Sequence, residues 1–344
     1  MQLSLFEGIF EARNFRALVR GSIVLASLLL SSLVIEQNTT ASAINLSPSQ
    51  LQPTIFAGDP GGTPPDSPAN RVDPNTSSSP FAGVVGLINS GGGVCSGTAI
   101  GIRYILTAAH CGSGTFSVYL NNGATTIVSG IATTFPGANF PFDDASIITL
   151  SQDLPVGFPT YQLSTAPILP GTTLTMVGYG GSGDVVNGDT VVGTASVKRT
   201  GANNADEFLD SSFNSTSFNS NPEFFAFDFD GPDGTTNLFG APIAPNLTLG
   251  NTIETTFRSG DSGGPSFIFD GTNYSVAGVN TFVFSDLSNP PAYGSGGGGY
   301  VVSYFAPWIN DIIGVPFEFS PSLGIGIIGL CSIVAHLRKR RKHS

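Results

Sequence analysis

Gly260-Asp261-Ser262-Gly263-Gly264-Pro265 is the most informative stretch of this chain of 344 residues. Glycines on both sides of Ser262 permit sharp backbone turns and let another molecule come close to the serine. A serine hydroxyl is a weak nucleophile until a neighbouring base takes its proton. The stretch continues as Pro265-Ser266-Phe267-Ile268-Phe269, which has the composition of a strand. It therefore predicts a tight turn that presents a serine at the start of a strand.

A candidate base lies far upstream, in Leu106-Thr107-Ala108-Ala109-His110-Cys111. His110 is the only histidine outside the C-terminal tail, which carries His336 and His343. Histidine is the side chain whose ordinary pKa lies nearest neutrality, so it is the usual general base for a hydroxyl. A lone histidine is more often a plain core or surface residue, and its surroundings decide between the two interpretations.

Two adjacent carboxylates follow, in Asp143-Asp144-Ala145-Ser146-Ile147-Ile148-Thr149-Leu150. Either one has the chemistry to orient an imidazole and to stabilise its protonated form. The residue types alone do not choose between Asp143 and Asp144.

The order His, Asp, Ser, with each residue in such a setting, resembles the trypsin/chymotrypsin family of serine peptidases over about residues 72–312. The resemblance implies an all-β fold of two six-stranded antiparallel β-barrels, with the active site between them and a short C-terminal helix near 307–313. It implies that Ser262 is the nucleophile and His110 the base, with the amides of Gly260 and Ser262 forming an oxyanion hole. In the family pattern the aspartate stands six residues before the leucine, which selects Asp144.

Further residues take roles through the same resemblance. Cys95 and Cys111 are 16 residues apart, as in the family's bridge beside its histidine, and we expect a disulfide between them. Thr256, Val283 and Gly298 fall at the specificity pocket, which favours small or medium apolar side chains before the scissile bond. The family pairs the residue before its serine with a freed amino terminus. Cleavage after Arg71 would let the Val72 amine meet Asp261.

Composition agrees with an all-β body. The 44 glycines and 24 prolines break the chain into short Val-, Ile-, Thr- and Phe-rich runs. The formal net charge is −11, with the basic residues gathered at the two ends. Because an acidic body repels phosphate, nucleic acid is not an expected partner. Asp228–Gly234 hints at a calcium loop, but its spacing misses the EF-hand pattern, so no metal or other cofactor is expected.

The two ends are typical of an exported protein. Residues 1–43 have a basic lead, an apolar stretch over 21–35 and small residues before position 44, which predicts a signal peptide removed by signal peptidase. An uncleaved anchor is the alternative. Residues 44–71 are rich in Pro, Ser, Asn and Thr, which predicts a mobile pro-segment.

Residues 313–344 contain Val315-Pro316-Phe317-Glu318-Phe319-Ser320-Pro321, then an apolar run and Arg338-Lys339-Arg340-Arg341-Lys342. This layout is similar to bacterial PEP-CTERM sorting signals, which an exosortase-like enzyme processes, although its core departs from Pro-Glu-Pro. A plain C-terminal membrane anchor is the alternative. Both a sorting signal and a membrane anchor would place residues 72–312 outside the membrane, either secreted or in the cell envelope.

The sequence thus favours a serine endopeptidase that acts on proteins or peptides. Two other classes stay open. One is an inactive relative that uses the same scaffold for binding in the envelope, and the other is a purely structural surface protein. An intact set of His110, Asp144 and Ser262 argues against the former, and the structural alternative leaves those motifs unexplained.

Overall fold

The computed structural model describes residues 55–314, except 77, 124, 233–235, 237–238, 240–247 and 285–292. The expected signal peptide, residues 1–43, and almost all of the expected sorting segment, 313–344, therefore lie outside the described residues. Within the described part, strands dominate, and no helix is long and apolar enough to cross a membrane. The same residues contain no cluster of three or more metal-binding side chains.

The first half of the body is a closed antiparallel barrel of six strands, as the sequence predicts. The strand order is β1-β2-β3-β6-β5-β4, and β1 closes the barrel by pairing with β4. Leu87, Ile105, Phe116 and Ile148 are among the side chains that fill it. The strands are β1 (Val84–Asn89), β2 (Val94–Gly101), β3 (Tyr104–Ala108), β4 (Gly114–Tyr119), β5 (Ile127–Thr134) and β6 (Ala145–Leu150).

The second half differs from the six-stranded expectation, since it is a seven-stranded antiparallel sheet with the order β10-β7-β13-β14-β15-β12-β11. Its extra strand, β11, has only three residues. The strands are β7 (Thr173–Gly178), β10 (Arg199–Asn204), β11 (Glu207–Leu209), β12 (Phe224–Asp228), β13 (Pro265–Phe269), β14 (Tyr274–Phe284) and β15 (Gly296–Val301). A separate hairpin joins β8 (Ser182–Asp184) to β9 (Gly188–Val191).

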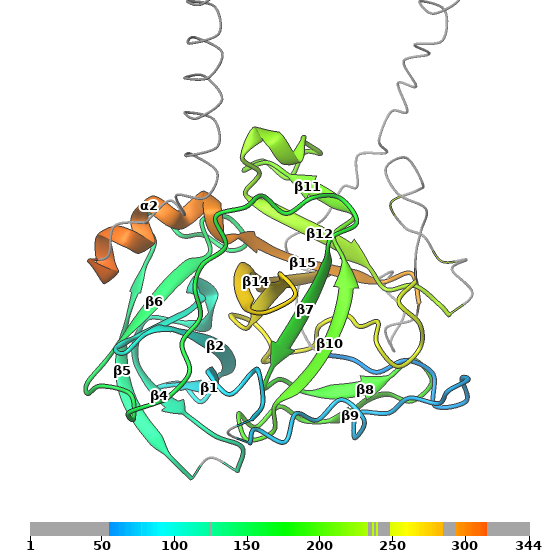
Figure 1. The fold of residues 1–344 in the computed structure, drawn as a ribbon, viewed down its shortest axis with the longest axis horizontal. Helices are drawn as coiled ribbons and strands as arrows, with labels where there is room; N and C mark the ends of the chain where they lie inside the picture. Colours follow the sequence, from blue (N-terminus) through cyan, green and yellow to red (C-terminus); the bar gives the residue numbers. More distant parts are fainter. Residues whose placement is uncertain are drawn as a thin grey trace, which may run out of the picture. The chain divides into compact units, whose positions relative to one another are not determined.

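Helix α2 (Val302–Ile313) follows β15 and packs beside the first barrel (Figure 1). Phe305 and Trp308 contact Phe135 at the end of β5, with ring centroids 5.1 and 5.4 Å apart. The helix begins five residues before Pro307, where the sequence predicted its start. Pro307 lies inside the helix, and its fixed φ suits a helical backbone although its ring removes one amide donor. The helix therefore ties the end of the second sheet back onto the first barrel.

Candidate active site

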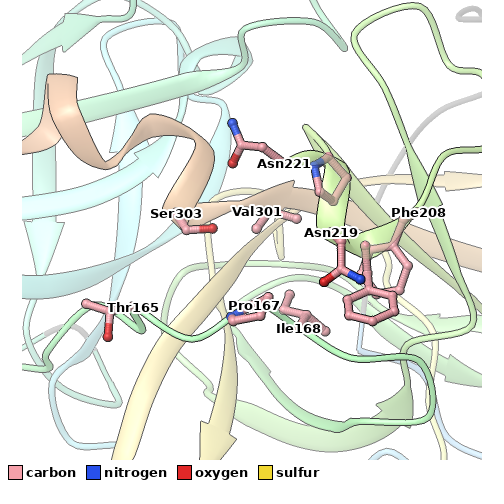
Figure 2. Close-up of a pocket in the computed structure, with 10 residues that line it drawn as sticks. Thr165, Pro167, Ile168, Phe208, Asn219, Asn221, Val301 and Ser303 are labelled. Atoms are coloured by element: carbon pink, nitrogen blue, oxygen red, sulfur yellow. The ribbon is translucent and has the colours of Figure 1, made fainter. Parts of the chain in front are cut away.

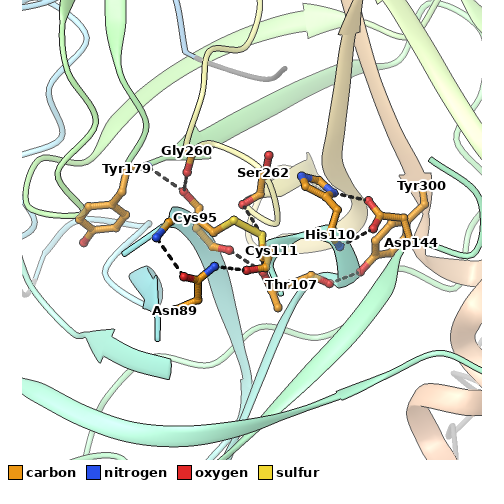
Figure 3. Close-up of a disulfide and its surroundings, with 12 residues drawn as sticks. Asn89, Cys95, Thr107, His110, Cys111, Asp144, Tyr179, Gly260, Ser262 and Tyr300 are labelled. Atoms are coloured by element: carbon orange, nitrogen blue, oxygen red, sulfur yellow. Dashed lines mark hydrogen bonds and ion pairs between the residues drawn. A yellow bond between two sulfur atoms is a disulfide. The ribbon is translucent and has the colours of Figure 1, made fainter. Parts of the chain in front are cut away.

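His110 and Asp144 are brought together by two paired strands. His110 lies in a 3-10 turn directly after β3, and Asp144 directly precedes β6, while Ala108 on β3 pairs with Ala145 on β6. The His110 amide donates to Asp144 Oδ1 at 2.8 Å, and His110 Nδ1 lies 2.6 Å from Oδ2 (Figure 3). Asp144 is fully buried. A buried carboxylate with both oxygens engaged holds the ring in one orientation and leaves Nε2 as its free nitrogen.

Asp143 has a different environment from its neighbour. Its backbone lies in the left-handed region with φ 52°, and its amide donates to Glu223 Oε1 at 2.7 Å. Asp144, chosen by motif register, is therefore the carboxylate that contacts the imidazole.

The Ser262 loop docks against the wall of the first barrel. The Ser262 carbonyl accepts a hydrogen bond from the Ser96 amide at 2.8 Å, and Ser96 Oγ donates to the Gly260 carbonyl at 2.8 Å. The Ser262 carbonyl oxygen also lies 3.6 Å from Cys111 Sγ, one residue beyond His110. Figure 3 shows the Ser262 side chain and the His110 ring turned toward the same space. Histidine, aspartate and serine therefore gather at the junction of barrel and sheet.

Gly263 makes this docking sterically feasible. It has φ +80°, and a Cβ there would stand 2.0 Å from Thr107 Oγ1 and 2.4 Å from the Ser96 carbonyl. Any other residue would push the loop away from β2 and β3.

The backbone around Ser262 leaves two amides without a partner among the described residues. Gly260 has φ +103°, a conformation that side-chain-bearing residues rarely adopt. Among the described residues, no hydrogen bond uses the amide of Gly260 or of Ser262, whereas the Gly263 amide donates to the Asn280 carbonyl at 2.8 Å. Both predicted donors are therefore available to a ligand.

Asp261 is buried behind this loop, and its partner is not the predicted one. Its Oδ2 accepts from the Ile55 amide and from the Arg258 amide at 3.3 Å, while Oδ1 accepts from Gly180 at 2.8 Å. Burial raises the pKa of Asp261 to about 7, although the Gly180 amide and the charge of Arg199 oppose that rise. The carboxylate thus fastens three backbone segments to the residue next to Ser262.

The structure gives Asp261 a different partner from the expected Val72. The Val72 side chain is 39% exposed, and its backbone bridges to Arg199. Arg71, the expected cleavage residue, is buried and forms an ion pair with Asp66. Its Nη1 and Nη2 donate to the carbonyls of Ile253 and Glu254 at 2.7 and 2.8 Å. A protease that cleaves after Arg71 would have to displace these side-chain contacts.

Residues 55–71 fold onto the body rather than forming the mobile segment that was expected there. Ile55, Phe56 and Ala57 are fully buried. The Phe56 amide donates to the Thr256 carbonyl at 2.9 Å, and the Ala57 amide to the Gly183 carbonyl at 2.9 Å. Ile55-Phe56-Ala57-Gly58 is an apolar pair followed by two small residues, and this pattern was the sequence signal for a buried segment.

The predicted disulfide is confirmed, since Cys95 and Cys111 are bonded with Cα atoms 6.0 Å apart. It joins β2 to the turn that carries His110, and the Asn89 side chain donates to the Cys111 carbonyl at 2.7 Å (Figure 3). The bridge therefore fixes the strand–turn unit from which the imidazole projects.

The three residues assigned to the specificity pocket lie on neighbouring segments. Val283 on β14 pairs with Gly297, one residue before Gly298 on β15. Thr256 is buried, and its Oγ1 has no hydrogen-bond partner among the described residues. Phe257, which the sequence did not single out, is fully buried beside Phe227 with ring centroids 5.1 Å apart. These four residues carry no charge and include an aromatic ring, which agrees with the expected preference for an apolar substrate side chain.

A separate cavity of about 290 Å³ lies near the start of α2 (Figure 2). Its walls include Ile168, Phe208, Phe218 and Val301, and none of His110, Asp144 and Ser262 lines it. It is therefore distinct from the site described above.

The comparison with protein families agrees with this geometry. The family model described as Trypsin matches residues 71–218, a span that holds His110 and Asp144 and ends before Ser262. No curated protein matches the chain. The match, together with the closed six-stranded barrel and the C-terminal helix, supports the trypsin-like serine peptidase family for this chain.

Proposed function

We propose that this protein is an exported serine endopeptidase that hydrolyses peptide bonds through an acyl-enzyme intermediate. The observation that carries the proposal is the 2.6 Å contact of His110 Nδ1 with buried Asp144, beside the loop of Ser262. With Nδ1 held in this way, Nε2 is the nitrogen that takes the Ser262 proton as the hydroxyl attacks a carbonyl. His110 then passes that proton to the leaving amine, and a water molecule releases the acyl group.

Two backbone donors would stabilise the developing oxyanion in this reaction. The free amides of Gly260 and Ser262 supply them, and each such donor is worth about 3 kcal/mol of transition-state stabilisation. Protein or peptide substrates would pair by strand addition with the 281–284 end of β14, beyond its pairing with β13, and place a small or medium apolar side chain against Thr256, Val283 and Gly298.

Covalent labelling tests the proposal against its rival, an inactive relative that only binds. A fluorophosphonate probe reacts with an activated serine and requires a working base and oxyanion hole. We expect labelling of protein that begins at Ile55, the activated form proposed in the next paragraph, and loss of that labelling in Ser262→Ala and in His110→Ala. A properly folded protein that begins at Ile55 and that the probe does not label would leave the binding role as the better explanation.

We further propose that cleavage of the Thr54–Ile55 bond activates the enzyme. The support is the buried contact between the Ile55 nitrogen and Asp261, since a freed amine at this nitrogen carries a positive charge that neutralises the carboxylate. Amino-terminal sequencing of active enzyme should begin at Ile55. Active enzyme that begins at Val72 would restore the original expectation.

The proposed location is the cell envelope or the medium. The signal features of residues 1–43 and the layout of residues 313–344 support it, with signal peptidase and an exosortase-like enzyme as processing partners and the membrane as a temporary one. Cell fractionation with intact-mass analysis tests both ends. A cytoplasmic protein with residues 1–43 still attached would contradict this location.

A further inference from the structure

A buried glutamate lies behind the candidate catalytic pair. Glu223, which directly precedes β12, is 1% exposed. Its Oε1 accepts the amide of Asp143 at 2.7 Å, and its carbonyl accepts the amide of Val301 at 2.8 Å. It therefore connects the second sheet to the turn that leads into Asp144.

The contact supports the unusual conformation of that turn. Asp143 has φ 52°, a left-handed backbone that a residue with a side chain adopts at a cost unless its surroundings hold it. Its carbonyl accepts the Ala145 amide at 2.9 Å, while its own amide is held by Glu223. Packing adds to the hydrogen bond, because Phe142 and Phe224 contact each other with ring centroids 6.2 Å apart.

The other carboxyl oxygen of Glu223 has no structural role in the described residues. Oε2 is buried and has no hydrogen-bond partner there. Leaving a buried polar atom unpaired costs about 1–3 kcal/mol, and more when the group is charged. An uncharged side chain of the same shape would hold the Asp143 amide without placing a charge in the interior.

The groups facing Glu223 make this placement electrostatically costly. Burial raises the pKa of Glu223 to about 7, and the charges of Asp143, Asp144 and Asp210 add to the rise. Tyr304 on α2 also faces it, since the charge of Glu223 contributes to the raised pKa of Tyr304. Among the described residues, Glu223 forms no salt bridge with a cation.

We propose that Glu223 is a positioning residue for the catalytic pair, because its hydrogen bond to the Asp143 amide holds the turn that presents Asp144 to His110. This proposal rests on the proposed peptidase function. Glu223 touches neither substrate nor the reacting atoms. It acts on His110 through the Asp143 backbone.

The test compares Glu223→Gln with Glu223→Ala in protein that begins at Ile55. Gln keeps an oxygen for the Asp143 amide, so kcat should stay within about threefold of the native value. Ala removes the hydrogen bond, so kcat should fall by about tenfold to a hundredfold with little change in KM, as for a slightly misplaced catalytic group. Equal kcat values for the two variants would overturn the proposal.

A matched control is Glu254→Gln. Glu254 is also a buried glutamate that accepts a backbone amide, that of Asp230 at 2.6 Å, and burial raises its pKa to about 7. No hydrogen bond among the described residues joins the Glu254 side chain to His110 or Asp144, so its substitution should leave kcat unchanged.

The split between the two kinetic constants separates a positioning role from a merely structural one. A general loss of folded protein would lower the yield of Glu223→Ala without changing kcat per active site, whereas a misplaced Asp144 lowers kcat itself.

Should Glu223→Ala fail to fold, hydrogen exchange of the Asp143 amide in the native protein gives a second measurement. The hydrogen bond to Glu223 should protect that amide, and exchange as fast as that of an exposed amide would overturn the proposal. Protein that begins at Ile55 and that the fluorophosphonate probe does not label would instead mean that the peptidase function itself has failed.

Discussion

Asp143 and Asp144 are adjacent in the chain but contact different residues. Asp144 is fully buried and engages the backbone and ring of His110, whereas the Asp143 amide is turned toward Glu223. Neighbouring carboxylates can therefore carry unrelated roles, because the left-handed backbone at Asp143 turns the two residues in different directions.

Substituting each aspartate by asparagine tests this difference. Asp144→Asn should lower kcat by about 10⁴-fold, because an amide favours the wrong imidazole tautomer and cannot stabilise the imidazolium. Asp143→Asn should change kcat by less than about threefold, since asparagine also tolerates the left-handed conformation. Steady-state kinetics on a peptide substrate measures both. A larger loss in Asp143→Asn would transfer the orienting role to Asp143.

Among the structural elements, the disulfide and the loop of Arg258 hold the site from two sides. Replacing both Cys95 and Cys111 by serine should lower the free energy of unfolding by about 3 kcal/mol, because the bridge closes a loop of about 15 residues in the unfolded chain. For a body of this size the melting temperature should fall by about 6–12 °C. Calorimetry measures the change, and Cys331→Ser, which leaves the bridge intact, is the matched control. No difference between the two proteins would mean that the bridge adds no stability.

Arg258 occupies a place where the related family often has a cysteine. Its guanidinium lies 4.8 Å from the centre of the Phe56 ring and forms an ion pair with Asp189 on β9. It therefore connects the Ile55 segment, the β8–β9 hairpin and the loop that leads to Ser262.

The two contacts of Arg258 should differ in strength. Arg258→Ala should lower the free energy of unfolding by about 1–2 kcal/mol, since it removes a largely buried cation from an aromatic face. Asp189→Asn should cost less than about 1 kcal/mol, because that carboxylate is 62% exposed and water screens the pair. Urea unfolding measures both, and equal losses would show that the ion pair, rather than the ring contact, holds the loop.

A feature could be predicted from the sequence when the residues that form it lie close together along the chain. His110, Cys95 and Cys111 lie in one strand–turn unit, so a short motif was sufficient to predict their arrangement. Ile55 meets Asp261 across 206 residues of chain, and Arg71 meets the Glu254 carbonyl across 183. Backbone partners at such separations leave no periodic signal in the sequence. Strand β11 was also not predicted, because a strand of only three residues is too short to show alternation of apolar and polar side chains.

For the whole molecule, buried carboxyl groups set how stability responds to pH. Burial raises the pKa of Glu223, Glu254 and Asp261 to about 7, and burial beside Asp228 also raises the pKa of Asp206. A carboxyl group whose pKa is higher in the folded state keeps a proton that the unfolded chain releases. Its contribution to stability is complete below about pH 4 and is lost as the pH rises through its folded pKa.

The melting temperature should therefore be higher at pH 5 than at pH 8. Glu254→Gln should reduce the difference in melting temperature between pH 5 and pH 8, because it removes one of the groups that release a proton on unfolding. Cleavage at Ile55 should reduce it as well, since the freed amine keeps Asp261 ionised in the folded state. Scanning calorimetry across pH 5–8 measures the effect. A melting temperature that rises over this range would show that other groups dominate the titration.

Strand β15 has no side chains beside the proposed specificity pocket, because its first four residues are Gly296-Gly297-Gly298-Gly299. A Cβ on Gly298 would stand 2.3 Å from the Phe225 carbonyl and 2.6 Å from the Phe282 ring. Evolution cannot easily add side chains along this strand, because carbonyls and phenyl rings already occupy that volume. In the proposed peptidase, changes in substrate choice must then arise on the facing segments, at Thr256, Phe257 and Val283.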